Sequence, residues 1–176
     1  MTQNVIHGYF IDERCLMVTT YTSEVSKNEQ FLVFLLDGKP YGFSLLNIEG
    51  IVGIPKIFPV KGLPDFIKGL VKVQEKFLPV VDLRFFLNKS KSRYSKHQSL
   101  ILAKSPQNKT QMIIGYIVDS IIGLFDVDLS QIKAPNDSDL KKSVFFSGKV
   151  SLEGKEVNIL NLDKIINNSE AVKFVK

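Results

Sequence analysis

FLVFLLDGKPYGFSLL, residues 31–46, is the stretch that decides the fold. Two apolar runs flank the pair Asp37-Gly38, and such a pair accepts the positive φ angles that a tight two-residue hairpin turn requires. We therefore expect two antiparallel strands joined at Asp37-Gly38. Pro40 has no N–H group to donate to a neighbouring strand, which predicts that the second strand lies at a sheet edge.

Short apolar segments continue along the chain beyond this hairpin. Most are rich in Val, Ile and Phe and are separated by Gly, Pro, Asn or Asp, which is typical of an all-β protein of barrel or sandwich type. The expected strands lie at 48–54, 77–81, 99–103, 111–118, 121–127, 144–152 and 156–160. Helix signals are few: one turn at 64–67, and a longer helix within 161–175 with Asn161 or Asp163 near its start.

Two segments, one in each half of the chain, resemble each other without gaps. LPVVDLRFFL (78–87) and VNILNLDKII (157–166) each run from an apolar strand into Asp82 or Asn161 and then into a Leu-x-x-apolar-apolar turn. Asp82 and Asn161 can each accept hydrogen bonds from the first free amides of a helical turn. The residues alone leave two alternatives open: chance reuse of a common turn, or a true repeat of two small β-modules.

The composition is that of an ordinary globular protein. The chain has 176 residues, 44% hydrophobic and 23% charged, which excludes a disordered, collagen-like or disulfide-framework protein. Cys15 is the single cysteine, so no intramolecular disulfide can form. The start of the chain lacks a signal-peptide pattern, and the longest apolar run, 112–125, is shorter than the ~20 residues of a membrane-spanning helix. We expect a cytoplasmic protein without direct membrane insertion.

The net charge of +5 comes from one stretch of the chain. Residues 89–110 carry six basic side chains and no acidic one, and the rest of the chain is nearly neutral. Proteins that bind nucleic acid spread Lys and Arg over a face with aromatic residues among them, whereas this stretch contains only Tyr94. A solvated loop is therefore favoured over a nucleic-acid surface. A steep loss of binding with rising salt would identify the latter.

Groups for catalysis or metal binding are scarce. His7 and His97 are the two histidines, and no His-x-x-x-His or Cys-x-x-Cys spacing for zinc is present. Cys15 and a histidine could in principle act as nucleophile and base, but all three residues lie outside the predicted strands. The aspartates that follow apolar strands stand where capping and turn carboxylates are common. We expect a binding protein with no enzymatic activity, cofactor or metal.

Several motifs appear in a fixed order along residues 30–167. They are Tyr41-Gly42, Ile51 with Gly53, Pro64 with FIKG (66–69), PVVDLR (79–84), GYIVDS (115–120), Ile132 with Pro135, and LNLDKII (160–166). Together they resemble the CheW-like adaptor domains of bacterial chemotaxis signalling.

The resemblance implies two SH3-like five-stranded β-barrel subdomains packed together over a shared apolar core, with a C-terminal helix. The subdomains would be intertwined and would cover roughly 30–88 and 98–167. An N-terminal extension, 1–29, would precede them and a tail, 168–176, would follow. This arrangement agrees with the internal similarity between 78–87 and 157–166.

The resemblance also implies a non-enzymatic adaptor. Such proteins couple the regulatory domain of a CheA-type histidine kinase to the cytoplasmic tips of methyl-accepting chemoreceptors, and other CheW-like proteins are further candidate partners. The protein would reach membrane receptor arrays through these partners. The alternatives are a CheW-like scaffold in a non-chemotaxis kinase pathway and, less favoured, a basic β-barrel that binds nucleic acid.

Carried over position by position, the resemblance assigns partner contacts to a small set of residues. They are Ile48, Ile51, Lys68, Gly69, Gln74, Val118 and Asp119. By residue type alone, the apolar members suit a core better than a contact surface. A bulky residue in place of Gly69, such as Gly69→Trp, would then block assembly without unfolding the protein.

The chain departs from the family pattern at 72–75, where Lys-Val-Gln-Glu replaces the usual Asn-Leu-Arg-Gly. Gln74 therefore stands where the family carries an arginine that serves docking, and an amide cannot replace a bidentate cation. This change puts the usual receptor contact in doubt and favours a divergent paralogue.

Overall fold

The computed structural model describes residues 27–87, 98–104, 112–135 and 144–168, which form two β-sheets and one α-helix. The strands are β1 (Asn28–Leu36), β2 (Lys39–Ser44), β3 (Ile48–Gly53), β4 (Ile57–Phe58), β5 (Ile67–Val73), β6 (Lys76–Asp82), β7 (Ser99–Lys104), β8 (Ile113–Val118), β9 (Ser120–Asp128), β10 (Phe146–Leu152) and β11 (Lys155–Leu160). The helical elements are the 3-10 turns η1 (Leu45–Asn47) and η2 (Leu129–Gln131) and the helix α2 (Leu162–Asn168). The predicted all-β class with a C-terminal helix is confirmed.

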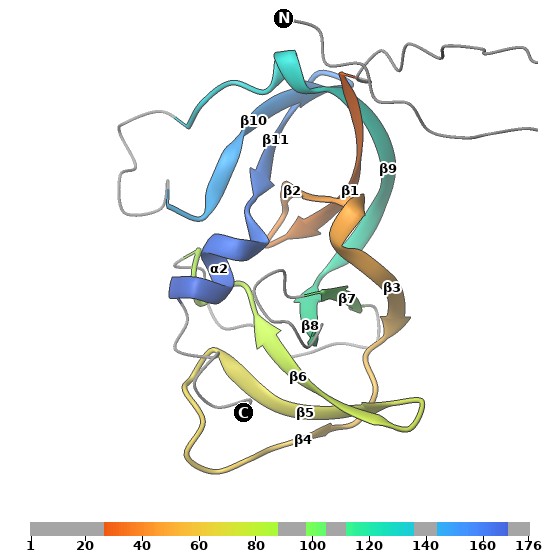
Figure 1. The fold of residues 1–176 in the computed structure, drawn as a ribbon, viewed down its shortest axis with the longest axis vertical. Coiled ribbons are helices and arrows are strands. Elements are labelled where there is room, and N and C mark those ends of the chain that lie inside the picture. The colour runs from red at the N-terminus through yellow and green to blue at the C-terminus, as the bar shows by residue number, and fades with distance from the viewer. Residues whose placement is uncertain (1–26, 88–97, 105–111, 136–143, 169–176) are drawn as a thin grey trace, which may run out of the picture.

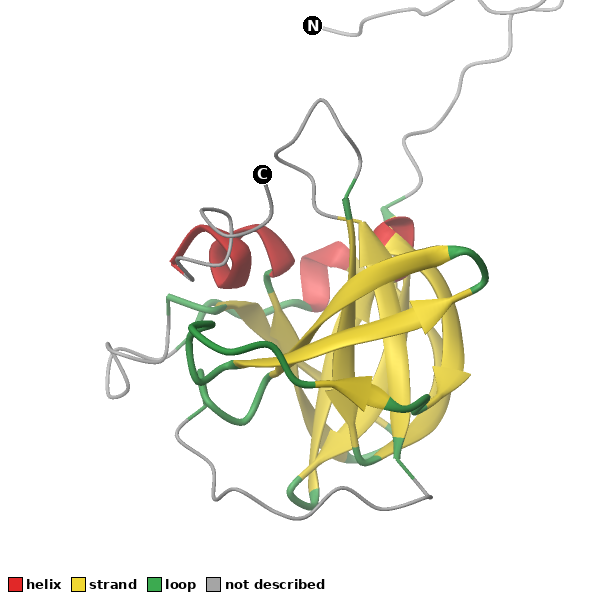
Figure 2. Ribbon diagram, turned by 90° about the horizontal axis from the view of Figure 1, so that it is seen from below, coloured by secondary structure: helices red, strands yellow, loops and turns green. Residues whose placement is uncertain are grey.

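The strands separate into two sheets, shown one above the other in Figure 1. The five-stranded sheet has the order β10-β11-β2-β1-β9, and the six-stranded sheet has the order β3-β7-β8-β6-β5-β4. Figure 2 shows strands that curve around an interior instead of lying flat, as expected for barrels. The two predicted barrel-like units are therefore present, and the short strand β4 extends the second one.

The sheets divide the chain differently from the expected subdomains at 30–88 and 98–167. The six-stranded sheet is built entirely from residues 48–118, and the five-stranded sheet combines β1 and β2 with β9 to β11. The chain therefore leaves the first sheet after β2 and returns to it after β8. In addition, β1 begins at Asn28, so the sheet includes the end of the expected 1–29 extension.

The β1–β2 hairpin has the predicted turn, but its second strand is not at an edge. Asp37 and Gly38 have φ angles of 52° and 72°, as a two-residue turn of this kind requires. The edge position predicted from Pro40 is wrong, because β2 lies between β1 and β11. β11 pairs only with Tyr41 and Gly42, so Pro40 lies outside the stretch in which β11 needs a donor.

The internal similarity corresponds to equivalent pairings in the two sheets. The β5–β6 and β10–β11 hairpins are antiparallel, and their second strands pair in parallel with β8 and β2 respectively. The predicted capping residue is the last residue of β6 and the first residue after β11: Asp82 Oδ1 accepts a hydrogen bond from Arg84 N, and Asn161 Oδ1 accepts one from Lys164 N, both at 3.0 Å. The repeat seen in the sequence is therefore structural.

Buried apolar residues form one core inside each sheet and a third, larger core that both sheets share. Along β1, Phe31 and Val33 face the interior of the five-stranded sheet, while the alternating residues Leu32 and Phe34 face the shared core. Strand β7 behaves in the same way in the six-stranded sheet. Both faces of β1 and β7 are buried, which explains why these strands are apolar without interruption.

Gly69 and Gly148 occupy equivalent positions at irregularities in the two repeated hairpins. At each of them another segment of backbone passes close by. A Cβ atom on Gly69 would lie 2.2 Å from the carbonyl oxygen of Phe58, and a Cβ atom on Gly148 would lie 2.6 Å from that of Lys133. Gly69 also has a φ of 135°, which side-chain-bearing residues rarely adopt. Both glycines are therefore required for packing.

We expect Gly69→Ala to lower the free energy of unfolding by about 2–3 kcal/mol, because the added methyl group must displace β4. Gly53→Ala is the matched control, since Gly53 has no heavy atom within 4 Å of the position of a Cβ atom. Urea unfolding of both variants measures the difference. Equal stability of the two variants would contradict the close approach of Phe58 to Gly69.

Candidate protein-interaction surface

A network of charged and polar side chains lies at the junction of the two sheets. Arg84, in the turn after β6, is only 2% exposed and forms ion pairs with Asp82 and Asp119. Asp119 stands between β8 and β9 and also accepts hydrogen bonds from Gln98 Nε2, at 2.8 Å, and from the backbone N–H of Asp37, at 2.6 Å. Asp119 therefore ties the β1–β2 turn to the six-stranded sheet.

The environment of Asp119 stabilises its ionised form. Burial acts to raise the pKa of this carboxyl group, but the hydrogen bonds from Asp37 and Gln98 and the positive charge of Arg84 outweigh it. The pKa of Asp119 consequently lies below its ordinary value. The geometry gives Asp119 a structural role at the junction, in addition to any contact with a partner.

Two of the predicted contact residues are buried. Val118 has no exposed surface and belongs to the shared core, so it offers no side chain to a partner in this structure. Gly69 is buried under β4. The expectation that Gly69→Trp would block assembly without unfolding is therefore corrected: the indole would first displace the backbone of Phe58.

The other predicted contact residues reach the surface to different degrees. Ile48 is partly buried and packs against the shared core. Lys68 is partly buried, and its Nζ donates a hydrogen bond to the carbonyl oxygen of Asp65 at 2.5 Å. Ile51 is 43% exposed on β3, and Gln74 is exposed in the β5–β6 turn with a φ of 54°. Ile51 and Gln74 are thus the most accessible of the set.

The structure shows an exposed aromatic pair that the sequence analysis missed. Phe58 on β4 and Phe77 on β6 are 42% and 59% exposed, and their rings meet edge to face with centroids 6.2 Å apart. Lys56 Nζ lies 5.5 Å from the centre of the Phe58 ring, and Val60 nearby is 44% exposed. We call Lys56, Phe58, Val60 and Phe77 the aromatic patch. The patch lies beside the β5–β6 hairpin, because β4 pairs with β5 and Phe77 is on β6. Gln74 is in the turn of the same hairpin.

Exposed aliphatic residues also lie on the strands at one edge of each sheet. They are Ile51 on β3, and Ile122 and Leu124 on β9, of which the last two are 45% and 56% exposed. In Figure 1 both strands are drawn on the same side of the protein. We call these three the edge residues. The sequence signal for Ile122 and Leu124 is the run Ile121–Phe125. This run is apolar on both faces, whereas a strand at a sheet edge buries only one of them.

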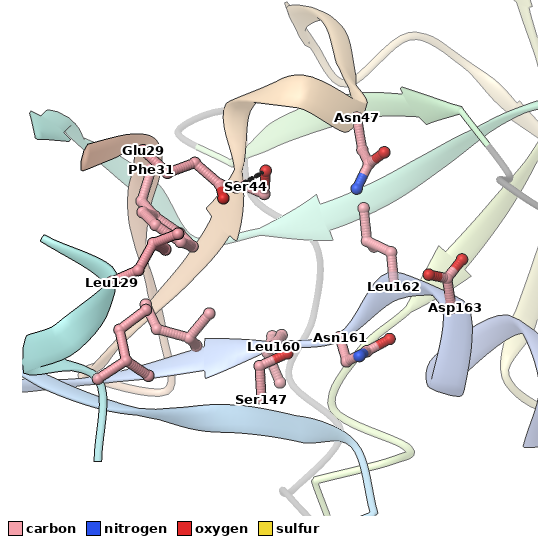
Figure 3. Close-up of a pocket in the computed structure, with 12 residues that line it drawn as sticks. Glu29, Phe31, Ser44, Asn47, Leu129, Ser147, Leu160, Asn161, Leu162 and Asp163 are labelled. Atoms are coloured by element: carbon pink, nitrogen blue, oxygen red, sulfur yellow. Dashed lines mark hydrogen bonds between the residues drawn. The ribbon is translucent and has the colours of Figure 1, made fainter. Parts of the chain in front are cut away.

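A small pocket opens between β1, β2 and η1 on one side and β10, β11 and α2 on the other (Figure 3). It encloses 210 Å³ and is lined by both apolar and polar side chains. Among the described residues that line it, the carboxylates of Glu29 and Asp163 are the only charged groups. None of the seven residues to which the resemblance assigns partner contacts belongs to this lining, although its motifs at Ile132 and 160–166 contribute to it.

Other sequence features are only partly within the described residues. His7, Cys15 and His97 lie outside them, as does most of the basic stretch 89–110. Lys104, which is described, forms an ion pair with Glu49. Within the described ranges there is no group of three His, Cys, Asp or Glu side chains suited to a metal ion. The search of the same residues found no helix long and apolar enough to cross a membrane.

Two barrel-like sheets around a shared core, with apolar residues left exposed on their strands, define a double-barrel interaction domain. The chain belongs to the CheW-like domain family, whose model matches residues 30–170. It is 29% identical over 146 residues to the chemotaxis protein CheW of Thermotoga maritima, covering 82% of this chain and 91% of that one. It is 24% identical over 143 residues to the chemotaxis protein CheW of Klebsiella aerogenes, covering 81% and 84%.

A solved structure supports the same fold. The scaffolding protein TtCheW from Thermoanaerobacter tengcongensis superimposes with a TM-score of 0.68 at 24% identity, covering 76% of this chain and 84% of that one. At this level of identity the likeness concerns the fold alone.

The depressed pKa of Asp119 predicts a specific loss of stability in acid. A carboxyl group with a lower pKa in the folded state stabilises the fold above the unfolded-state value of about 4, and this contribution disappears as the pH falls through the folded-state pKa. We expect Asp119→Asn to be less stable than the parent protein at pH 7 and to show a smaller further loss in acid. Urea unfolding between pH 7 and pH 3 measures this, with Asp126→Asn, exposed on β9, as the control. Parallel pH curves for the parent protein and Asp119→Asn would contradict the assignment.

Proposed function

We propose that this chain is a non-enzymatic adaptor that couples methyl-accepting chemoreceptors to a CheA-type histidine kinase in bacterial chemotaxis. The observation that carries the proposal is the match of the CheW-like domain to residues 30–170, which spans both sheets. The described residues add exposed apolar surface on both sheets, and affinity in protein interfaces comes mainly from a few side chains that become fully buried. The protein acts in the cytoplasm and reaches receptor arrays through its partners.

The aromatic patch is our candidate surface for the kinase regulatory domain. Phe58 and Phe77 hold each other in place edge to face, so little side-chain entropy is lost when a partner covers them. Both rings stand on strands that pair with β5, Phe58 on β4 and Phe77 on β6. Lys68 and Gln74, two residues predicted as contacts, lie on β5 and in the turn that follows it. A partner that covers the patch would therefore also meet this hairpin.

The edge residues are our candidate surface for the receptor tip. They present aliphatic side chains from both sheets, and Ile51, which the resemblance assigns to partner binding, is one of them. A helical receptor tip would bury such side chains through an apolar stripe of its own. Asp119 lies directly before β9, so the junction network positions this surface.

A CheW-like scaffold in another kinase pathway is the second candidate function, and the β5–β6 turn favours it. Lys72 and Glu75 form an ion pair at 3.4 Å across this turn, and Gln74 projects no charge. A partner that binds an arginine at this position would instead meet the neutral amide of Gln74, next to the ion pair of Lys72 and Glu75. The pathway is therefore best identified by testing the cognate kinase directly.

Calorimetric titration with the regulatory domain of a CheA-type kinase from the same organism should show one-to-one binding in the micromolar range. Phe77→Ala should weaken this binding about 30-fold, the effect of losing a hot-spot aromatic worth about 2 kcal/mol. Leu124→Ala is the matched control, because it removes a similarly exposed apolar side chain from the other sheet. Absence of binding to any such kinase would refute the chemotaxis adaptor, and equal weakening by both variants would refute the location of the kinase surface.

Ile51→Asp should reduce binding to the receptor's cytoplasmic tip at least about tenfold, because it places a charge in an apolar contact. Kinase binding by the same variant should stay within about twofold of the parent protein. Co-sedimentation with receptor-containing membranes measures the first, and calorimetry the second. Loss of both activities with an unchanged circular dichroism spectrum would show that the two partners share one surface.

A further inference from the structure

The pocket in Figure 3 is separate from both surfaces proposed above. Its lining comes from the five-stranded sheet, η1, η2 and α2, whereas the aromatic patch lies on the six-stranded sheet. None of the edge residues lines it. A group bound in the pocket therefore leaves the proposed kinase and receptor surfaces free, and its binding does not require the proposed function.

The size of the pocket indicates what kind of group it holds. Its volume of 210 Å³ is below the lower end, about 300 Å³, of pockets that bind whole small-molecule ligands. Leu129 and Leu162 lie on opposite sides of the opening in Figure 3 and can flank an aliphatic stem. These dimensions suit one long side chain inserted from outside.

The charge of the pocket indicates a cation. Within the described part of the chain, its charged lining residues are Glu29, from β1, and Asp163, from α2, and both are acidic. Ser44 donates a hydrogen bond to Glu29, which orients this carboxylate. Asp163 is partly buried, and its negative charge acts on the hydroxyl group of Tyr116, which is itself buried without a hydrogen-bond partner among the described residues. Two carboxylates in one pocket favour a cation that brings its own hydrogen-bond donors, because hydrogen bonds between charged groups are the stronger ones.

We propose that the pocket binds an arginine side chain presented by a partner protein. A guanidinium group carries five N–H donors in a plane and is more weakly hydrated than the ammonium group of lysine, so it enters a half-apolar pocket at lower cost. The amide oxygens of Asn47 and Asn161, which also line the pocket, are further acceptors for these donors. The apolar lining receives the methylene groups of the stem.

The test uses the full-length protein and a minimal probe, N-acetyl-arginine methylamide. Titration is followed by ¹⁵N–¹H NMR up to about 50 mM, with the neutral isostere N-acetyl-citrulline methylamide as the matched control. We expect saturable shifts confined to the amides of the pocket, such as Ser44, Asn47 and Asn161, with the arginine probe only. Shifts that are absent, that do not saturate or that also occur with citrulline would overturn the proposal.

Substitutions locate the binding site. Asp163→Asn should weaken probe binding at least about tenfold, as expected for a lost charge-assisted hydrogen bond. Ser147→Phe, which fills the pocket from β10, should abolish it and provides a second readout if Asp163→Asn fails to fold. Glu75→Gln removes a carboxylate that is 92% exposed on the six-stranded sheet and should change nothing. Equal effects of Glu75→Gln and Asp163→Asn would mean nonspecific attraction to acidic surface.

Two further experiments distinguish a partner's arginine from a lysine and from the chain's own arginine. Equal affinity for N-acetyl-lysine methylamide would overturn the choice of a guanidinium group. Arg14 is the only Lys or Arg in residues 1–26, which precede β1 and lie outside the described residues. Arg14→Gln should leave the affinity for the probe unchanged, and tighter binding by this variant would assign the pocket to the chain's own arginine instead of a partner's.

Discussion

A buried arginine fixes the position of the two sheets relative to each other. Arg84 is almost completely removed from solvent, and a guanidinium group cannot be neutralised by losing its proton, so the fold must surround it with carboxylates. Asp82 comes from the same turn, but Asp119 comes from the point where the chain returns to the five-stranded sheet. Asp119 in turn accepts the backbone N–H of Asp37. The charge of Arg84 thereby determines where the β1–β2 hairpin is placed on the six-stranded sheet. The position of the edge residues follows from this placement.

The rest of the architecture follows from repeating one small module. Each copy joins a bulged hairpin to a parallel strand from elsewhere in the chain, and each uses a glycine at the bulge, Gly69 or Gly148, to let another segment pass. The two copies differ in what their surfaces carry. The first exposes the aromatic patch, whereas the second adjoins α2 and the acidic pocket. Similar scaffolds therefore present chemically different faces.

The sequence allowed the local features to be predicted, because they depend on neighbouring residues. The Asp37-Gly38 turn, the capping roles of Asp82 and Asn161 and the internal repeat are examples. Features that depend on distant pairings were missed. The short strand β4 pairs with β5 where the backbone of Phe58 passes close to Gly69, and the interior position of β2 depends on β11, near the other end of the chain. The resemblance pointed to the region around Lys68 and Gln74, but only side-chain exposure separated Phe77 on the surface from Val118 in the core.

The insertion of residues 48–118 between the two parts of the five-stranded sheet has a consequence for biosynthesis. All strands of the six-stranded sheet have left the ribosome once β8 has emerged, so this sheet can assemble during translation. The β1–β2 hairpin, synthesised first, must wait for β9 to β11 before its interior face is covered. The β1–β2 hairpin is thus synthesised first but is among the last elements to reach its final packing. Until β9 to β11 have been made, its apolar side chains can be covered only by the six-stranded sheet.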